Sequence, residues 1–176
     1  VPPEGIERHI IHGCGSVVLQ VFAGDKVRLI DIEGLQRTEV AAYVNGQWDT
    51  GVLGLSGSEN PHIQPELQTQ LAHRNIALGG LTVAPLFGSE SKAGETVQMT
   101  AQKNAILVAM VPGTVMAVDA QNPPTQIQLY IERANPDMVV SQPLPDPLMD
   151  PLQDFQIDRR TANTYEVKAG QWIQII

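Results

Sequence analysis

Alternating apolar and polar side chains form the main pattern along the chain, and they predict strands separated by tight turns. Ala23-Gly24-Asp25 and Asn45-Gly46 each stand between two alternating segments, which is typical of hairpins. A continuous apolar run, residues 105–111, suits a strand that is buried on both faces. The predicted strands are residues 16–21, 27–30, 39–44, 96–101, 105–111, 114–118 and 126–132.

One segment has the spacing of a helix. Pro65 suits a first helical turn, Leu67 and Leu71 lie four positions apart, and the helix is expected to end near Arg74-Asn75. Prolines near the N-terminus disfavour regular structure, and a later segment is rich in Gly and Ser. The segments interpreted as an N-terminal arm and a loop are residues 1–12 and 50–60.

Together these patterns predict a mainly β fold, an antiparallel barrel or sandwich with one short helix, over residues 1–134. Five of the thirteen prolines lie between Pro136 and Pro151, which predicts a Pro-rich linker or wrapping segment over residues 135–160. Residues 161–176 are then either the start of a second related repeat or the last strand of the same sheet.

Composition and charge narrow the function classes. The 176 residues include 43% hydrophobic side chains, which is enough for a folded core. A net charge of −8 and a sequence pI near 4.8 repel phosphate and anionic lipid, so we expect no nucleic acid and no membrane partner. No apolar run has transmembrane length. The single cysteine, Cys14, cannot form an internal disulfide, which favours a cytoplasmic location.

An internal similarity is the most informative feature. Val21 to Ile30 can be laid over Val167 to Ile176, because both contain an Ala-Gly turn that leads into an alternating strand. Weaker copies are residues 92–99 and 111–116. Since the chain stops just after the copy at Val167, one hypothesis is that it is the N-terminal part of a longer polypeptide. The alternative is that this copy supplies the last strand of one sheet.

The N-terminal third carries a recognisable arrangement of these turns and strands. It consists of Gly13-Cys14-Gly15, Phe22-Ala23-Gly24-Asp25, the strand Val27 to Ile30, and the turn from Asp31 to Gln36. In these residues the chain resembles the urea carboxylase-associated family, which includes carboxyguanidine deiminase subunits. Members of that family are described as related to the glycine cleavage T-protein, an aminomethyltransferase.

The resemblance implies an accessory role. Some large bacterial proteins of this type carry such domains ahead of a tetrahydrofolate-dependent aminomethyltransferase domain, so tetrahydrofolate is expected for the parent protein and no cofactor for this domain. The domain would assemble with a second related domain or with another copy of itself, or cover a small amine substrate. Two alternatives stay open: an enzyme acting on a C–N bond of a small guanidino or urea-like compound, and a non-catalytic module that dimerises through a strand edge.

Candidate catalytic groups lie in the turn from Asp31 to Gln36, the family-like turn. Asp31, Glu33 and Gln36 follow a predicted strand, and loops at strand ends commonly carry binding groups. If the segment is extended, Asp31 and Glu33 lie on the same side and suit acid–base work or cation recognition. The competing interpretation is turn chemistry, in which Asp31 bonds its own backbone and Gly34 takes an unusual φ.

The histidines and the cysteine supply further candidates. His9, His12 and Cys14 are close enough in sequence to serve one Zn²⁺, although a fourth ligand is missing nearby. His62 and His73 flank the predicted helix, and either is a candidate base near neutral pH. The competing interpretation for each is a surface or capping residue. Acidic residues that recur every fourth position are a candidate divalent-cation site or solvated turn acids: Asp146, Asp150, Asp154 and Asp158.

Overall fold

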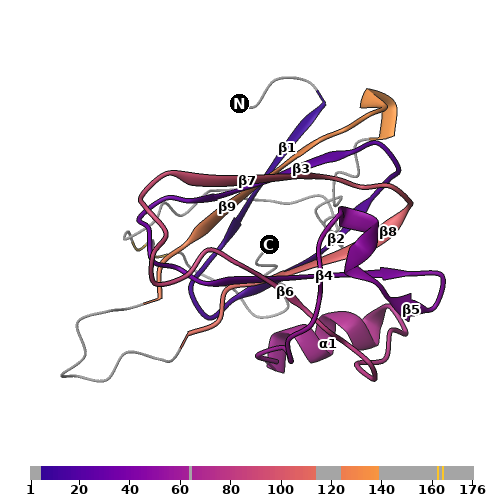
Figure 1. Cartoon of the computed structure of the whole chain (residues 1–176), viewed down its shortest axis with the longest axis horizontal. Coiled ribbons are helices and arrows are strands. Elements are labelled where there is room, and N and C mark those ends of the chain that lie inside the picture. The colour runs from indigo at the N-terminus through magenta and orange to yellow at the C-terminus, as the bar shows by residue number, and fades with distance from the viewer. Residues whose placement is uncertain (1–4, 64, 114–123, 139–161, 163, 165–176) are drawn as a thin grey trace. The chain divides into compact units, whose positions relative to one another are not determined.

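The computed structural model of the chain describes residues 5–63, 65–113, 124–138, 162 and 164. The chain divides into two compact units, Val1–Val139 and Val140–Ile176. Every described helix and strand belongs to the first unit (Figure 1). The predicted strand at residues 114–118, the acidic positions 146–158 and the last repeat copy lie outside the described residues.

Two antiparallel sheets make up the first unit, which confirms a mainly β, sandwich-like fold. The described strands form two separate sheets and not a closed barrel. Sheet A has the order β1-β9-β3-β7, with β1 Ile6–Ile11, β9 Ile127–Glu132, β3 Lys26–Asp31 and β7 Glu95–Thr100. Sheet B has the order β2-β8-β4-β5, with β2 Ser16–Val21, β8 Ala105–Met110, β4 Thr38–Val44 and β5 Gln47–Trp48, while β6 Ala84–Leu86 also pairs with β4.

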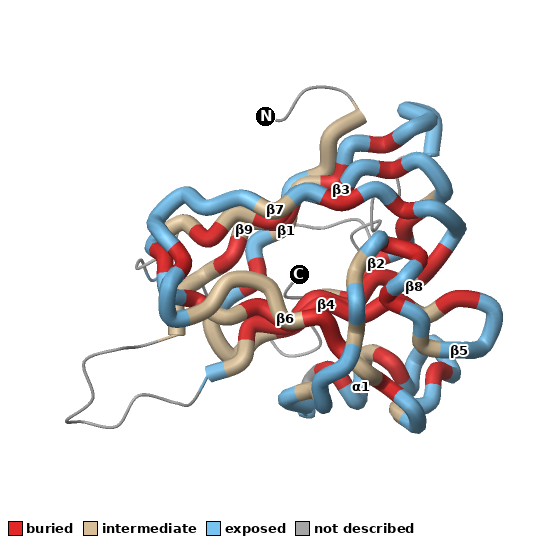
Figure 2. Tube along the Cα trace, in the orientation of Figure 1, coloured by how far each residue is buried: buried red, intermediate tan, exposed pale blue. Residues whose placement is uncertain are grey.

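The main core lies between the two sheets, because each strand directs alternate side chains inward (Figure 2). Strand β9 shows the pattern clearly, since its apolar positions are fully buried and the residues between them are not. The alternation predicted for residues 126–132 is thus confirmed. Fully buried inward residues include Val27, Leu29, Val40, Ala42, Leu107, Ala109, Ile127, Leu129 and Ile131.

A second, smaller core lies under the helix α1, Pro65–His73, which covers the outer face of sheet B (Figure 1). Leu67 and Leu71 are fully buried there, as their spacing predicts. Strand β8 is buried on both faces because it has the main core on one side and this helix-covered core on the other. The helix stops at His73, and Asn75 takes the left-handed conformation with φ 55°.

The predicted turns are present. Asn45 and Gly46 have φ values of 49° and 85° and join β4 to β5, as a two-residue hairpin turn requires. Gly24 has φ 92° at the turn between β2 and β3. Two short 3-10 helices complete the described elements, Thr50–Leu53 and Pro136–Met138.

Two expectations were wrong. The predicted N-terminal arm contains strand β1, and β1 pairs with β9 in sheet A. The strand pattern is hidden because β1 contains charged residues. One of them, Glu7, is paired with Arg133, a partner far along the chain that the local sequence does not reveal. The segment 50–60 is not all loop, since it begins with a 3-10 helix and Glu59 forms a β-bridge with Val83. Among the described residues, no helix is long and apolar enough to span a membrane.

Candidate functional site

The family-like turn is a closed hydrogen-bond network. The Asp31 carboxylate is fully buried and accepts hydrogen bonds from the backbone N–H groups of Gly34 and Gln36, at 2.9 and 3.0 Å. It also accepts a 2.7 Å hydrogen bond from the Ser91 hydroxyl. Gly34 takes φ 83°. The interpretation of Asp31 as turn chemistry is therefore confirmed by its contacts.

Gln36 extends this network between strands. Its amide nitrogen donates to the carbonyl oxygens of Arg37 and Pro112, at 2.8 and 3.1 Å. Its side-chain oxygen accepts a 2.7 Å hydrogen bond from the backbone N–H of Thr125. Glu33, by contrast, is exposed. Asp31 and Glu33 do not share a side, because the segment is a turn and not an extended strand.

The three proposed zinc ligands are spread along β1 and the turn that follows it. His9 lies on β1, with its Nε2 3.4 Å from the Glu7 carboxylate, and His12 is exposed after the strand ends. Cys14 occupies the turn with φ 63° and is half-buried. Among the described residues, no group of three His, Cys, Asp or Glu side chains could hold a metal ion. The zinc site thus stays a prediction that needs ligands from elsewhere.

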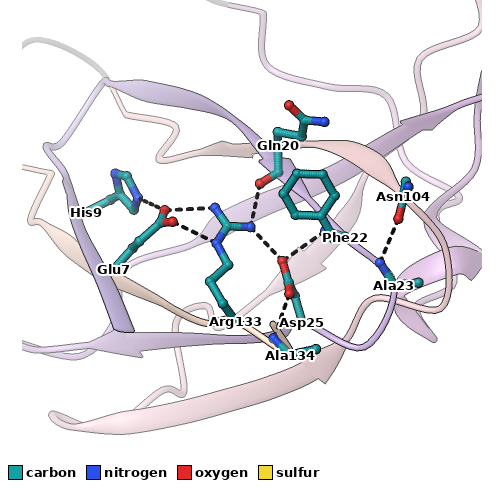
Figure 3. Close-up of polar contacts among 9 residues, drawn as sticks. All are labelled: Glu7, His9, Gln20, Phe22, Ala23, Asp25, Asn104, Arg133 and Ala134. Carbon is teal, nitrogen blue, oxygen red and sulfur yellow. Dashed lines mark hydrogen bonds and ion pairs between the residues drawn. The ribbon is translucent and has the colours of Figure 1, made fainter. Parts of the chain in front are cut away.

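A buried ion-pair cluster links strand β1, the turn between β2 and β3, and the residue that follows β9 (Figure 3). The Arg133 side chain is 1% exposed and donates to Glu7 at 2.7 and 2.9 Å and to Asp25 at 2.6 Å. It also donates to the carbonyl of Gln20 at 3.0 Å. Burial acts to lower the pKa of the Arg133 guanidinium, but the hydrogen bonds with Glu7 and Asp25 outweigh burial and raise it. Each charged group of the cluster has a charged partner, so loss of Arg133 would leave two carboxylates buried without their counter-ion.

The most site-like group lies on the outer face of sheet B, where Glu39 is fully buried on β4. Glu39 stands opposite Met110 on β8 and Pro85 on β6, on the same face as Ala41 in the helix-covered core. A carboxylate with no exposed surface needs several donors to offset its loss of hydration.

Two residues supply those donors. Arg37 donates from Nε to the Glu39 carboxylate at 3.1 Å, and the backbone N–H of His62 donates at 2.8 Å. The His62 ring adds a third contact, with its Nδ1 2.5 Å from the same carboxylate. The other end of the Arg37 guanidinium pairs with Glu59. That hydrogen bond with Glu59 raises the pKa of Arg37, burial opposes the rise, and the bond to Glu39 adds to it.

The Glu39 group differs from the clusters around Asp31 and Arg133 because the His62 side chain faces solvent. The His62 side chain is 64% exposed, whereas Glu39 is 0% exposed. A buried carboxylate that holds one ring nitrogen of an exposed imidazole fixes the tautomer and orientation of the ring. The arrangement can accept or donate a proton at the other ring nitrogen. His73, the other candidate base, is exposed in the last turn of α1.

Sequence reasoning identified His62 as a candidate base but not its partner, which lies 23 positions away in the chain. The sequence pattern predicts only a strand at Glu39. A signal was present, because Glu39 shares its alternation with Ala41 and Tyr43 on the face that the helix covers. A charged residue at such a position predicts a buried, paired group.

Comparison with known proteins gives one informative match. No protein-family signature matches the chain. A trimethylamine-oxide aldolase of Ruegeria pomeroyi is 32% identical to it over 187 residues, an alignment that covers 99% of this chain. The chain spans 24% of the length of that enzyme. By sequence, therefore, the whole chain is similar to about one quarter of a trimethylamine-oxide aldolase.

Proposed function

We propose that this chain is one domain of a larger enzyme that acts on a small methylated amine or its N-oxide. The observation that carries the proposal is the 32% identity to a trimethylamine-oxide aldolase over nearly the whole chain. Similarity that extends from end to end favours a shared domain over a shared motif. Because the match occupies a quarter of the relative, the proposal assigns this chain a part in the reaction and not the whole of it.

Within that enzyme we assign the chain an accessory role, either structural or covering the substrate. The polar groups of the family-like turn support this role, because the side chains of Asp31 and Gln36 form hydrogen bonds with other parts of the fold. The resemblance to the urea carboxylase-associated family and to aminomethyltransferase-linked domains supports the same assignment. The proposed location of the enzyme is cytoplasmic.

Tetrahydrofolate is the proposed cofactor of the parent protein. An aldolase reaction splits its substrate with release of an aldehyde. For trimethylamine oxide the atoms balance as formaldehyde and dimethylamine, so the reaction yields a one-carbon unit. A tetrahydrofolate-dependent domain is a suitable acceptor for such a unit, and the resemblance to aminomethyltransferase-linked domains implies a domain of this kind in the parent protein.

A stand-alone enzyme is the second candidate function, and the Glu39–His62 pair favours it. An oriented, exposed imidazole is a suitable acid–base group for cleavage of a C–N bond in a guanidino or urea-like compound. In this case the isolated chain would be active without any other domain.

A dimerising module is the third candidate function. It requires a sheet edge whose backbone groups are free to pair with a strand of a second copy. On the β2 edge of sheet B, the Val18 carbonyl accepts from Arg74 and the Gln20 carbonyl from Arg133. These arginines occupy hydrogen-bonding groups that another strand would need. Strand β7 forms an edge of sheet A and is the candidate strand for pairing with a second copy.

A domain exchange tests the first proposal. The stretch of the Ruegeria pomeroyi enzyme that matches this chain would be replaced by the 176 residues, and formaldehyde and dimethylamine release from trimethylamine oxide measured. We expect the chimera to release both at least about tenfold faster than a variant with the stretch deleted. Size-exclusion chromatography would confirm that the chimera is folded. A folded chimera no faster than the deletion would contradict the proposal.

The isolated chain separates the alternatives. We expect it to release no formaldehyde from trimethylamine oxide and no ammonia from guanidino or urea-like compounds. Turnover by the isolated chain would favour the stand-alone enzyme. Sedimentation as a dimer, without turnover and with an inactive chimera, would favour the interaction module.

A further inference from the structure

We propose that the Nε2 atom of His62 binds a small alkylammonium ion, which donates an N–H hydrogen bond to it. The accessory role proposed above does not use this site, although the stand-alone enzyme of the second candidate function does. The inference rests on the geometry and charge of Glu39, Arg37, Glu59 and His62. Four properties of the cluster support this binding: Glu39 is ionised, His62 is held in one tautomer, its ring is exposed, and the cluster carries a net negative charge.

The Glu39 carboxylate is held in its acceptor form. The backbone N–H of His62 and the Nε of Arg37 are both obligatory donors, and they contact different oxygens of the carboxylate. An ionised carboxylate accepts hydrogen bonds at both oxygens and donates none. The third contact, from the His62 ring, is therefore also a donor contact.

It follows that Nδ1 of His62 carries the hydrogen. Nδ1 lies 2.5 Å from Oε1 of Glu39, so the neutral ring is the Nδ1–H tautomer, with the lone pair on Nε2. The Glu39 side chain is 0% exposed, and water therefore competes little for this hydrogen bond. Among the described residues, no contact in the structure uses Nε2. The acceptor nitrogen is thus fixed on a ring that is 64% exposed.

The charge of the cluster selects the ligand. Two carboxylates, Glu39 and Glu59, face one guanidinium, Arg37, so the cluster carries one net negative charge while the imidazole is neutral. The whole chain is also acidic, with a net charge of −8. An anion would be repelled, whereas a cation is attracted. The cation must donate a hydrogen bond to Nε2, and a small ammonium ion with at least one N–H group does both.

Glu39 is a positioning residue in this proposal, and Arg37 supports Glu39. Arg37 links the buried carboxylate to Glu59, which is 45% exposed. Through Arg37, the buried carboxylate of Glu39 is thus joined to a second carboxylate that reaches solvent. Loss of Glu39 would free the His62 ring to adopt either tautomer, while the ring itself would remain accessible.

Nitrogen-15 NMR of the intact chain tests the first steps. In mildly alkaline buffer, where an ordinary imidazole is mostly neutral, we expect His62 to show a protonated Nδ1 and an unprotonated Nε2. His73 is a suitable internal control, because it is exposed at the end of α1. Its signals should show the mixture of tautomers of a free imidazole. A His62 ring with the same mixture as His73 would overturn the proposal.

A ligand titration tests the binding step. Dimethylammonium chloride and tetramethylammonium chloride carry the same charge, but only the first has N–H donors. We expect dimethylammonium to shift the His62 ring signals in a saturable manner, and tetramethylammonium to bind about tenfold more weakly, as loss of one hydrogen bond predicts. Equal effects of the two ions at matched ionic strength would show ion-atmosphere effects alone and overturn the proposal.

Two variants complete the test. Glu39→Gln should restore a mixed tautomer at His62 and weaken dimethylammonium binding. Because Glu39 is buried and this variant can lose stability, His62→Gln serves as the second variant, observed through saturation transfer to the ligand's methyl protons. We expect transfer to be lost in His62→Gln and kept in His73→Gln. Unchanged transfer in His62→Gln would overturn the proposal. No step uses turnover, so the result is independent of the proposed aldolase function.

Discussion

Arg133 balances more buried charge than any other residue whose contacts are described above. Its side chain and that of Asp25 are each 1% exposed, and that of Glu7 is 10% exposed. Removal of the guanidinium would leave two carboxylates out of water without a counter-ion. The exposed pair of Lys26 and Glu132 is different, because either side chain can return to solvent when its partner is lost.

We therefore predict that Arg133→Met lowers the free energy of unfolding by about 3–5 kcal/mol, as measured by urea denaturation. Arg28→Met is the matched control. Arg28 is exposed on β3, where its guanidinium lies 4.9 Å from the centre of the Tyr130 ring, a contact worth about 0.5–1 kcal/mol. Equal losses in the two variants would contradict the inference that Arg133 is the counter-ion that the buried carboxylates require.

The same comparison has an expected pH dependence. The pKa of Arg133 is raised in the folded chain, so the stability that its charge contributes is fully present below the pKa of an ordinary arginine. That contribution is lost only as the pH rises through the raised pKa. The part of the difference in unfolding free energy between the native chain and Arg133→Met that comes from ionisation of Arg133 should thus be constant across the neutral range.

At the scale of elements, local patterns were predictable and distant partners were not. The hairpin at Asn45-Gly46 and the helix with Leu67 and Leu71 follow from neighbouring residues, and the structure has both. Strand β1 was missed because the partner of Glu7 is Arg133, 126 positions away. Only one member of the candidate site, His62, could be predicted, because its partner is also distant in the sequence. A sequence shows that His62 is present, but not which carboxylate lies beside its ring.

The turn between β3 and β4 shows the same limit for two neighbouring carboxylates. Asp31 and Glu33 are alike in sequence terms, yet Asp31 is fully buried with three donors and Glu33 is exposed. The difference arises because Gly34, with φ 83°, folds the backbone around the Asp31 side chain. The turn is therefore specified by one carboxylate and not by a pair.

We predict that Asp31→Asn destabilises the chain by about 1–3 kcal/mol, because one carboxylate oxygen becomes an NH₂ group that faces donors. Glu33→Gln, the control in the same turn, should change stability by less than about 0.5 kcal/mol. Thermal unfolding followed by circular dichroism measures both. If Glu33→Gln is as destabilising as Asp31→Asn, the two carboxylates act together and the turn has a role that its hydrogen bonds do not explain.

At the scale of the whole molecule, paired charges determine what the chain can attract. The 11 basic side chains are outnumbered by 19 acidic ones, and several of the basic side chains are already engaged. Arg133 is buried, Arg37 is shared between two glutamates, and Arg74 donates to a backbone carbonyl. The field that a distant ligand meets is therefore negative, which agrees with a cationic ligand at His62 and disfavours polyanions.

The negative field leads to a last prediction, that the chain does not bind duplex DNA even at about 50 mM salt, where phosphate contacts are strongest. Electrophoretic mobility or fluorescence anisotropy would measure binding. The matched control is the same chain with an added run of lysines long enough to reverse its net charge. That variant should bind DNA, and its affinity should fall steeply as salt is added, because its contacts would be with phosphate. Salt-sensitive binding by the native chain would instead mean that its basic residues form a local patch strong enough to overcome a net charge of −8. In that case net charge alone would not exclude nucleic acid as a partner.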